Sequence, residues 1–489
     1  MQAASPARPR PRSQGSSSSL WTLFLTCAFI VSRIGYYRLG VRFDASPLGE
    51  YLQYVDPGLL QHSLLQSVFY LHGQPPLFNL FLGIVLKLFP TSYPAAFAAI
   101  YLGIGVALLL SIHMLLVRTG VPGWLSAFIV LAFSINPVTI LHENWLFYTY
   151  PVTLLVSLSA LFLQRYAEQE RRLDLTILFA LLTVLALTWS AFHLVYVAAT
   201  AILMVVSMRS RARQIAAFGA VSLLVIASVY AKNLLLFGTF GCGAIYPKIN
   251  LALMTTKRLP NAKKLVKRGA ISRTSRVPVY GTTVANHTVP LDDPTGIDVL
   301  DQVVKAGGRP NWHHIAYLKV ADRYFADALW TLREHPETYV ESVRLNISRY
   351  FKPASDTFGS LPGNPTLLKR SVAVFNRVVP GRVAQTGVGW HLIVALPLAM
   401  LCGILLLSRR GRGWLGVQDD ALSPRRVTIA FCLATLAYMF LVTVLISAAD
   451  QYRYRAMVTP CYLLLVGQIV TLLLRALGAR SPATARGGA

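Results

Sequence analysis

Two acidic residues lie directly beyond long apolar runs of the chain. Asp44, in GVRFDASP, follows the run 20–37, and Glu143, in LHENWLFYTYP, lies between the runs 123–141 and 146–164. A carboxylate at a membrane–water boundary can take a proton from a hydroxyl group, because partial desolvation raises its pKa. Two such acids on one face could also hold a metal ion. The plain alternative for each is a solvated loop acid.

Basic residues suited to phosphate lie beside two other apolar runs. Arg453 and Arg455 alternate with tyrosines, including Tyr452, in the segment DQYRYR. The guanidinium fork matches phosphate oxygens, whereas tyrosine suits the membrane interface, so headgroup contacts are the alternative. Lys232 and Asn233, in YAKNLLLFGTFG, end an earlier run. A lysine in this position meets either lipid headgroups or a specific phosphate.

A short apolar piece, 73–89, begins with polar residues and two prolines. His72 and Gln74 precede Pro75 and Pro76 in HGQPPLFNLFLGIVLKLF. Two prolines favour an extended entry into a helix, and a simple helix start is the alternative to a binding role. The apolar part is short for a membrane span. We therefore expect it to lie at the interface or to dip in partway.

The composition excludes an ordinary soluble protein. Of 489 residues, 54% are hydrophobic and 13% are charged, whereas a soluble chain carries about 25% charge. The mean hydropathy is +0.52. The net charge of +26 lies largely between apolar runs, which favours membrane orientation and phosphate-bearing lipid over nucleic acid. The five cysteines form no CxxC or Cys/His metal spacing, so no disulfide framework or zinc site is indicated.

The apolar runs predict an all-α membrane protein with about ten transmembrane helices. The first run is long and lacks a small-residue cleavage site, so we interpret it as a retained span rather than a signal peptide. The stretch 173–208 is too long for one helix, and we expect two short helices that turn near 189–193. The expected spans are 20–37, 94–117, 123–141, 146–164, two within 173–208, 215–237, 389–408, 427–447 and 456–474.

The positions of the arginines test this topology. Ten spans place both termini in the cytoplasm, and every short inside loop is then basic, whereas the short outside loops 142–145 and 189–193 hold no Lys or Arg, as the positive-inside rule requires. The inside arginines are Arg8, Arg10, Arg12, Arg118, Arg165, Arg171, Arg172, Arg209, Arg211, Arg213, Arg409, Arg410, Arg412, Arg425, Arg426, Arg475, Arg480 and Arg486. Asp44 and Glu143 then share the outer face.

This topology divides the chain into five parts. A disordered cytoplasmic tail, 1–19, precedes spans one to seven in 20–237, with the first outer segment 38–93 among them. A large extracytoplasmic loop, 238–388, follows; its sequence indicates no particular fold. Spans eight to ten occupy 389–475, and a second cytoplasmic tail occupies 476–489.

The ordered set of motifs resembles the GT-C superfamily of polyprenyl-phosphate-dependent glycosyltransferases. The closest branch is that of the protein O-mannosyltransferases and the lipid A aminoarabinose transferase. There an Asp follows the first helix, as Asp44 does. An HPPL-like entry comes next, with Gln74 here where His is usual, and then a second acid, here Glu143 without its usual arginine. KNLLLFGTFG and RYR followed by Pro460 match later motifs. The resemblance covers most of 20–475.

The resemblance implies transfer of a sugar from a dolichyl or undecaprenyl phosphate to a hydroxyl group on the outer face, with inversion. Asp44 would be the general base. Arg453, Arg455 and Lys232 would stabilise the lipid phosphate that leaves. Glu143 and His72 would shape the acceptor or sugar site, with Gln74, Asn233 and Tyr452 among the binding residues. No cofactor is certain. A divalent cation is left open, because two carboxylates alone provide few ligands for one.

The resemblance and the composition also predict the partners of the chain and the membrane that holds it. The acceptor would be a glycan, a lipid or a protein, membrane lipids would be further partners, and no nucleic acid is expected. A homo- or hetero-oligomer is left open. The composition favours the bacterial plasma membrane, or the endoplasmic reticulum membrane for a eukaryotic chain. Two alternatives remain: a lipid-linked glycan flippase or transporter, with essential groups within the membrane, and a non-catalytic GT-C-like protein that does not need Asp44.

Overall fold

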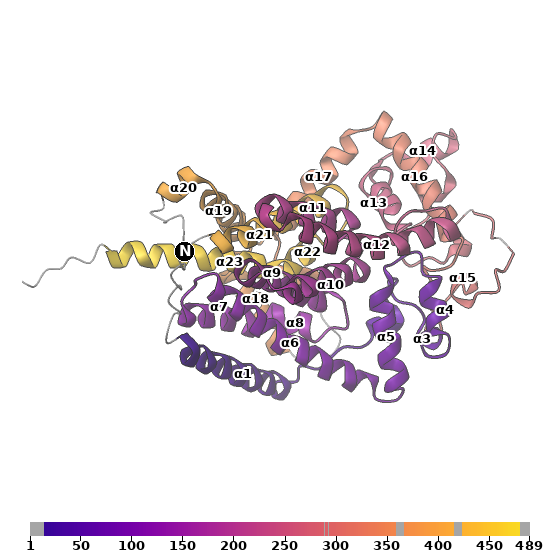
Figure 1. The fold of residues 1–489 in the computed structure, drawn as a ribbon. Helices are drawn as coiled ribbons and strands as arrows, with labels where there is room; N and C mark the ends of the chain where they lie inside the picture. Colours follow the sequence, from indigo (N-terminus) through magenta and orange to yellow (C-terminus); the bar gives the residue numbers. More distant parts are fainter. Residues whose placement is uncertain (1–13, 288, 292, 358–365, 415–422, 480–489) are drawn as a thin grey trace, which may run out of the picture.

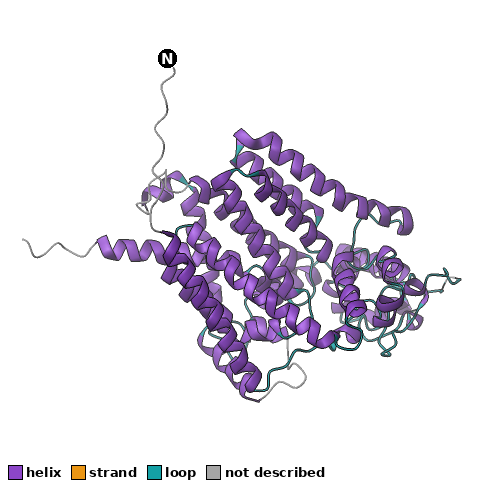
Figure 2. Ribbon diagram, turned by 60° about the horizontal axis from the view of Figure 1, so that its bottom comes forward, coloured by secondary structure: helices purple, strands orange, loops and turns teal. Residues whose placement is uncertain are grey.

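The computed structural model describes residues 14–287, 289–291, 293–357, 366–414 and 423–479 (Figure 1). Their regular structure is helical, without β-strands beyond isolated bridges. A bundle of long helices forms one part, and short helices cover one of its ends (Figure 2). The chain is therefore an all-α protein, as expected.

The bundle is built from both halves of the chain. Its N-terminal helices are α1 Gln14–Arg38, α6 Tyr93–Arg118, α7 Gly123–Ile135, α8 Pro137–Glu143, α9 Thr149–Gln169, α10 Arg172–Thr188, α11 Leu194–Ser207 and α12 Ala212–Phe237. Its C-terminal helices are α19 Trp390–Leu407, α20 Arg409–Trp414, α21 Ser423–Leu445, α22 Gln451–Met457 and α23 Thr459–Ala479. The start of α1 and the end of α23 lie at the same end of the molecule, on the left in Figure 1.

Six described helices are long and apolar enough to cross a membrane, so the chain is a multi-pass membrane protein. They are Leu20–Arg38, Tyr93–Arg118, Arg209–Phe237, Trp390–Leu407, Pro424–Leu445 and Thr459–Leu477. A seventh is reached when α7 and α8 count as one bent span. The expected count of ten is not confirmed. Helices α9, α10 and α11 do not meet the requirement, and α10 and α11 have only 17 and 14 residues.

The bend between α7 and α8 has a local cause. The two helices meet at 63°, and the junction is Asn136 followed by Pro137. Asn136 is extended, and its side-chain oxygen accepts a hydrogen bond from the Thr139 N–H at 2.8 Å. Pro137 supplies no N–H and fits the first turn of a new helix. The sequence thus ends one helix and begins another inside a single apolar run.

The predicted inside loops meet at one end of the bundle. Arg118, at the end of α6, pairs with Glu168 at 2.5 Å. Arg211 pairs with Glu170, and Arg165 pairs with Asp174 at 2.8 Å. These pairs join the loops α6–α7, α9–α10 and α11–α12, which is the grouping that the arginine pattern predicted.

Short helices from the two long outer segments cover the other end of the bundle, and most of them, from α3 to α5 and from α13 to α16, lie on the right in Figure 1. The first segment holds α2 Pro47–Glu50, α3 Pro57–His62, α4 Leu64–Phe69 and α5 Pro76–Leu88. The second holds α13 Tyr246–Met254, α14 Ala262–Lys267, α15 Asp298–Asp301, α16 Tyr317–Glu334, α17 Glu337–Tyr350 and α18 Thr366–Val378. Leu65 and Leu88 are 77% and 67% exposed, which suits the interfacial position expected for the first segment.

The two outer segments are tied together by buried polar contacts. Lys305, 2% exposed, donates to the Tyr51 carbonyl at 2.6 Å. The Ala306 N–H donates to the Asp56 carboxylate at 2.6 Å, and the Ala244 N–H donates to the His72 carbonyl at 3.3 Å. These contacts fix the large loop on the first outer segment.

The predicted tails differ partly from expectation. Residues 14–19 of the expected N-terminal tail form the first turns of α1, and 476–479 of the second tail end α23. The remainder, 1–13 and 480–489, lies outside the described residues.

A buried ion pair joins α1 to the end of α8. Two Arg33 nitrogens donate to the two Glu143 oxygens, at 2.9 and 2.5 Å. The Tyr150 hydroxyl donates to Glu143 at 2.8 Å, and Arg33 donates to the Ser134 hydroxyl at 3.1 Å. The side chains of Arg33 and Glu143 are 10% and 1% exposed. Buried charges require such pairing.

We predict that Glu143→Ala lowers the thermal stability of the purified protein strongly. Arg33 is then left buried without its partner, which costs about 3–5 kcal/mol. The double variant Arg33→Met/Glu143→Leu removes both charges and recovers most of the loss. Glu170→Ala breaks the exposed pair with Arg211 and changes the stability little, because solvent screens exposed pairs. Equal unfolding temperatures for Glu143→Ala and Glu170→Ala would contradict the assignment.

Candidate functional site

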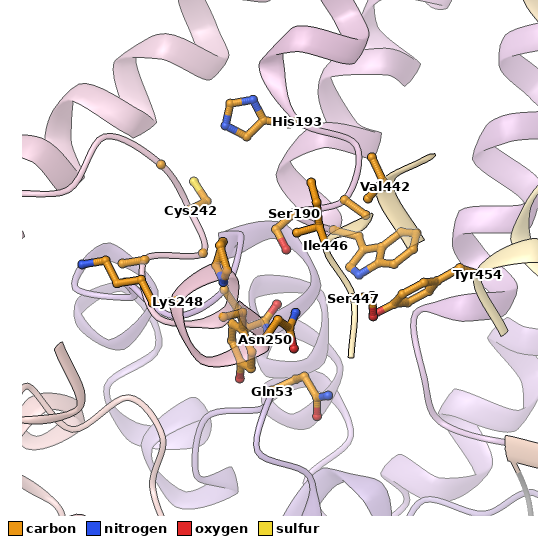
Figure 3. A pocket seen from close by; sticks show the side chains of 18 of the residues that line it. Gln53, Ser190, His193, Cys242, Lys248, Asn250, Val442, Ile446, Ser447 and Tyr454 are labelled. Carbon is orange, nitrogen blue, oxygen red and sulfur yellow. The ribbon is translucent and has the colours of Figure 1, made fainter. Parts of the chain in front are cut away.

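A cavity of about 650 Å³ lies between the large loop 238–388 and the end of the bundle opposite the Arg118, Arg165 and Arg211 pairs (Figure 3). Its volume is within the range of small-molecule sites, about 300–1,000 Å³. The loop 239–244 and α13 form one side, on which Figure 3 labels Cys242, Lys248 and Asn250. The outer end of α21 and α22 form the opposite side, which includes Ser447 and Tyr454.

Arg453 is the buried cation of this cavity. Its side chain lines the cavity and the residue is 3% exposed. One nitrogen, Nη2, lies 3.4 Å from Asp450. Nε and Nη1 are buried and make no hydrogen bond of good geometry, although the Tyr148 hydroxyl interacts with the guanidinium. Buried donors are nearly always satisfied, so two such donors on one guanidinium indicate a place for an external acceptor.

Aromatic rings surround the Arg453 guanidinium. Its Cζ lies 4.7 Å from the Phe147 ring centre, 5.6 Å from that of Tyr148 and 5.0 Å from that of Tyr454. Burial lowers the pKa of Arg453, but Tyr148, Asp450 and Tyr454 outweigh it and raise the pKa above its usual value. The cation is therefore retained in an apolar setting, where its attraction for an anion is strong.

Asp44 lies beside the segment that follows Glu143. The Asp44 N–H donates to the Asn144 carbonyl at 2.8 Å, and the Asp44 carbonyl accepts from the Leu146 N–H at 3.0 Å. The two acidic segments expected on one face are therefore adjacent. Asp44 is half-buried, and its carboxylate accepts from the Ser46 N–H at 2.9 Å. It is not among the residues that line the cavity.

Tyr51 connects Asp44 with the cavity. Burial raises the pKa of Tyr51, and both the Asp44 carboxylate and the Arg453 guanidinium act on its hydroxyl. The ring packs on Trp145 and Phe147, with centres 5.7 and 5.5 Å apart. Asp44 and Arg453 thus lie within electrostatic reach of one side chain.

Glu143 does not line the cavity. Both of its oxygens are occupied by Arg33, and Oε2 also accepts from Tyr150. Arg33 of α1 therefore neutralises the Glu143 carboxylate. This arrangement suits a positioning role for Glu143 better than acid–base chemistry.

His72 and Gln74 have different environments. His72 is fully buried and shares a hydrogen bond of 3.0 Å, through Nε2, with the His313 carbonyl. Burial lowers the pKa of His72 to about 4, and the bond to His313 offsets only part of that shift. Gln74 lines the cavity. His72 therefore joins the two outer segments, whereas Gln74 lies on the cavity wall, where its side chain interacts with the Tyr246 hydroxyl.

Lys232 and Asn233 hold elements next to the cavity rather than lining it. Lys232 donates to the Phe69 carbonyl at 2.5 Å, at the end of α4. Asn233 is buried and donates to the Gly241 carbonyl at 2.6 Å. Gly241 lies in the loop that forms one cavity side, so Asn233 fixes that loop.

Arg455 and Tyr452 also lie outside the cavity lining. Arg455 donates to the Tyr350 carbonyl and, at 2.8 Å, to the Lys352 carbonyl. Cations commonly stabilise such carbonyls at a helix C-terminus, here that of α17. Of the RYR pair, the structure therefore places only Arg453 in the cavity.

Several cavity residues were not singled out from the sequence. They are Trp189, His193, Asn250, Tyr280 and Asp450, among others. The aromatic run NWLFYTY was visible, but nothing in the sequence placed it against Arg453. Residues of the large loop carried no usable signal because that loop had no expected fold.

Among the described residues, no group of three or more His, Cys, Asp or Glu side chains is arranged to hold a metal ion. A divalent cation remains open. Comparison of the chain with protein-family models, with curated proteins and with solved structures gave no match.

We predict that His72 makes stability depend on pH. Its folded-state pKa of about 4 lies below the unfolded value, near 6.5, so the unfolded chain binds more protons between these values. The stability is therefore complete above about pH 6.5 and falls as pH falls toward 4. His72→Gln makes the loss of unfolding temperature between pH 7 and pH 5 smaller. The exposed His62→Gln leaves it unchanged, and an unaltered profile for His72→Gln would contradict the prediction.

Proposed function

We propose that the chain is a membrane glycosyltransferase of the GT-C type. It would move a sugar from a polyprenyl phosphate to an extracytoplasmic hydroxyl group. The observation that carries the proposal is Arg453, a buried guanidinium on the wall of a cavity next to the bundle, with two nitrogens that make no hydrogen bond of good geometry. The order of sequence motifs supplies the chemical class.

Arg453 would bind the phosphate of the donor. In displacement at the anomeric carbon, the bond between that carbon and the phosphate oxygen breaks, and the oxygen keeps the electron pair. The leaving group needs positive charge rather than a proton. A fixed cation in a water-poor site supplies such stabilisation without reorganisation. The aromatic rings around Arg453 would pack on the sugar or on the first isoprene unit.

Asp44 would be the general base. The acceptor oxygen attacks the anomeric carbon from the face opposite the phosphate, its proton passes to the Asp44 carboxylate, and the configuration inverts. Base and phosphate-binding cation must therefore lie on two sides of a sugar. The effect of both Asp44 and Arg453 on Tyr51 is consistent with this separation. Glu143 then acts by holding the 144–148 segment between them.

The finer topology belongs to the same proposal. Ten membrane crossings would require α9, α10 and α11 to span with the other helices. Their ends support this: Arg165 and Arg211 lie with the basic loops, whereas Trp189 packs on Tyr454 at 4.7 Å at the opposite end. The cavity would then face the outside of a bacterial plasma membrane, or the lumen for a eukaryotic chain.

Transport of a lipid-linked glycan is the second candidate, and one observation favours it. The Arg33–Glu143 pair lies inside the bundle, and ionisable groups within the membrane often mark transport pathways. In that case Glu143→Gln stops the movement of a fluorescent lipid-linked sugar across proteoliposomes. A glycosyltransferase has no such requirement.

We predict that the reconstituted protein releases polyprenyl phosphate from at least one polyprenyl-phosphate sugar in the presence of membrane acceptors. Asp44→Asn lowers the rate about 10²–10⁴-fold by removing the base. Arg453→Met lowers it about 10²–10³-fold by removing the stabilising cation. Release is measured by thin-layer chromatography of labelled lipid.

Matched variants control for folding and charge. Glu50→Gln and Arg276→Met change exposed residues of the same two outer segments, and both retain wild-type rates. Full activity of Asp44→Asn would remove Asp44 as the base. Absence of release by the wild type from every donor would contradict the enzyme proposal.

A further inference from the structure

We propose that the large-loop side of the cavity is a subsite for a neutral carbohydrate acceptor. The inference rests on the proposed glycosyltransferase function and deepens it, because neither the motifs nor Arg453 distinguishes a glycan from a protein or lipid acceptor. Two groups of residues carry it: an exposed tyrosine ring that is fixed in place, and side-chain amides that face the cavity without partners.

Tyr280 forms an aromatic platform at the cavity. Its side chain lines the cavity but remains 48% exposed. The ring is stacked on the buried Trp312, with centres 5.6 Å apart and planes 26° apart. Trp312 is stacked in turn on Tyr317 at 5.0 Å and on Tyr246 at 6.1 Å. This stack fixes the orientation of Tyr280, so a ligand that packs on the exposed ring meets a preorganised surface.

An exposed, fixed tyrosine suits the apolar face of a sugar ring. The C–H groups of one sugar face pack on an aromatic ring, and the hydroxyl groups at the edge remain free for hydrogen bonds. Tyrosine provides a large contact area at low entropy cost and tolerates water at its polar end. The position is outside the bundle, which makes it reachable by a water-soluble glycan.

Two amides complete the subsite. Asn250 in α13 and Gln53 in the first outer segment both line the cavity, and Figure 3 labels both. Neither side chain makes a hydrogen bond to another described residue. An amide offers a donor and an acceptor side by side, which matches neighbouring sugar hydroxyls. On the large-loop side of the cavity, Lys248 is paired with Asp322, so the groups beside Asn250 suit a neutral ligand.

The positions distinguish this subsite from that of the donor. Arg453 is buried against the bundle, where a lipid phosphate can reach it, whereas Tyr280 and Asn250 belong to the loop that faces outward. The two regions still belong to one cavity, because Tyr280, Asp450 and Tyr454 line it together with Arg453. An acceptor on Tyr280 can therefore reach a sugar held beside Arg453.

The test measures glycan binding without any lipid donor. Wild-type protein in neutral-lipid nanodiscs is mixed with tetrasaccharides of gluco, manno, galacto and arabino configuration, and binding is followed by saturation-transfer NMR and intrinsic fluorescence. At least one tetrasaccharide binds. Tyr280→Ala and Asn250→Ala each weaken binding about tenfold, whereas Tyr280→Phe stays within twofold. Arg453→Met retains binding.

Controls separate this inference from the proposed function. Tyr37→Ala removes an exposed tyrosine of α1, and unfolding temperatures show that each variant is folded. The inference is overturned when no tetrasaccharide binds, when Tyr280→Ala binds as the wild type does, or when binding requires Arg453. Lipid-phosphate release without glycan binding would leave the enzyme proposal intact. Glycan binding without release would contradict the enzyme proposal and retain a carbohydrate site.

Discussion

The Arg33–Glu143 ion pair is the interaction on which the outer end of the bundle depends. It holds the end of α8 against α1 at the point where the broken α7–α8 pair changes direction. The chain that follows lies beside Asp44 through two backbone hydrogen bonds. It then places Phe147 and Tyr148 against Arg453. One buried ion pair therefore positions the chain beside Asp44 and the aromatic rings that surround Arg453.

Arg453 shows what the rest of the fold makes possible. A lone guanidinium in an apolar setting is costly unless it is paired. Here one nitrogen approaches Asp450, the Tyr148 hydroxyl interacts with the guanidinium and three rings surround it, but two nitrogens make no hydrogen bond of good geometry. The scaffold keeps the charge and leaves its hydrogen bonds incomplete. A phosphate would complete them, which is the physical reason to regard this arrangement as a binding site.

The sequence predicted the features that follow from hydropathy and charge. Apolar runs gave the helices, and the arginine pattern grouped loops that the structure joins through Arg118–Glu168 and Arg211–Glu170. The same pattern placed Asp44 and Glu143 on one face, and the structure adds that their segments are adjacent. The number of membrane spans did not follow from hydropathy and charge. Packing and local breaks such as Asn136–Pro137 decide where one helix ends and the next begins.

Roles within the site were less predictable, because they depend on distant partners. Arg453 and Arg455 are two residues apart in one motif, yet one lines the cavity and the other binds the carbonyls that end α17. Lys232 likewise stabilises the end of α4. The sequence identifies the residue type but not the carbonyl group to which its side chain donates a hydrogen bond. Tyr280 was invisible because its stack on Trp312 exists only in the folded loop.

The most direct test of the central claim is an electron cryomicroscopy structure of the protein in nanodiscs with undecaprenyl phosphate or dolichyl phosphate. The account predicts that the phosphate lies in the cavity, with its oxygens within hydrogen-bond distance of Arg453 Nε and Nη1. A phosphate bound elsewhere on the protein, with Arg453 unchanged and the cavity free of lipid, would contradict it.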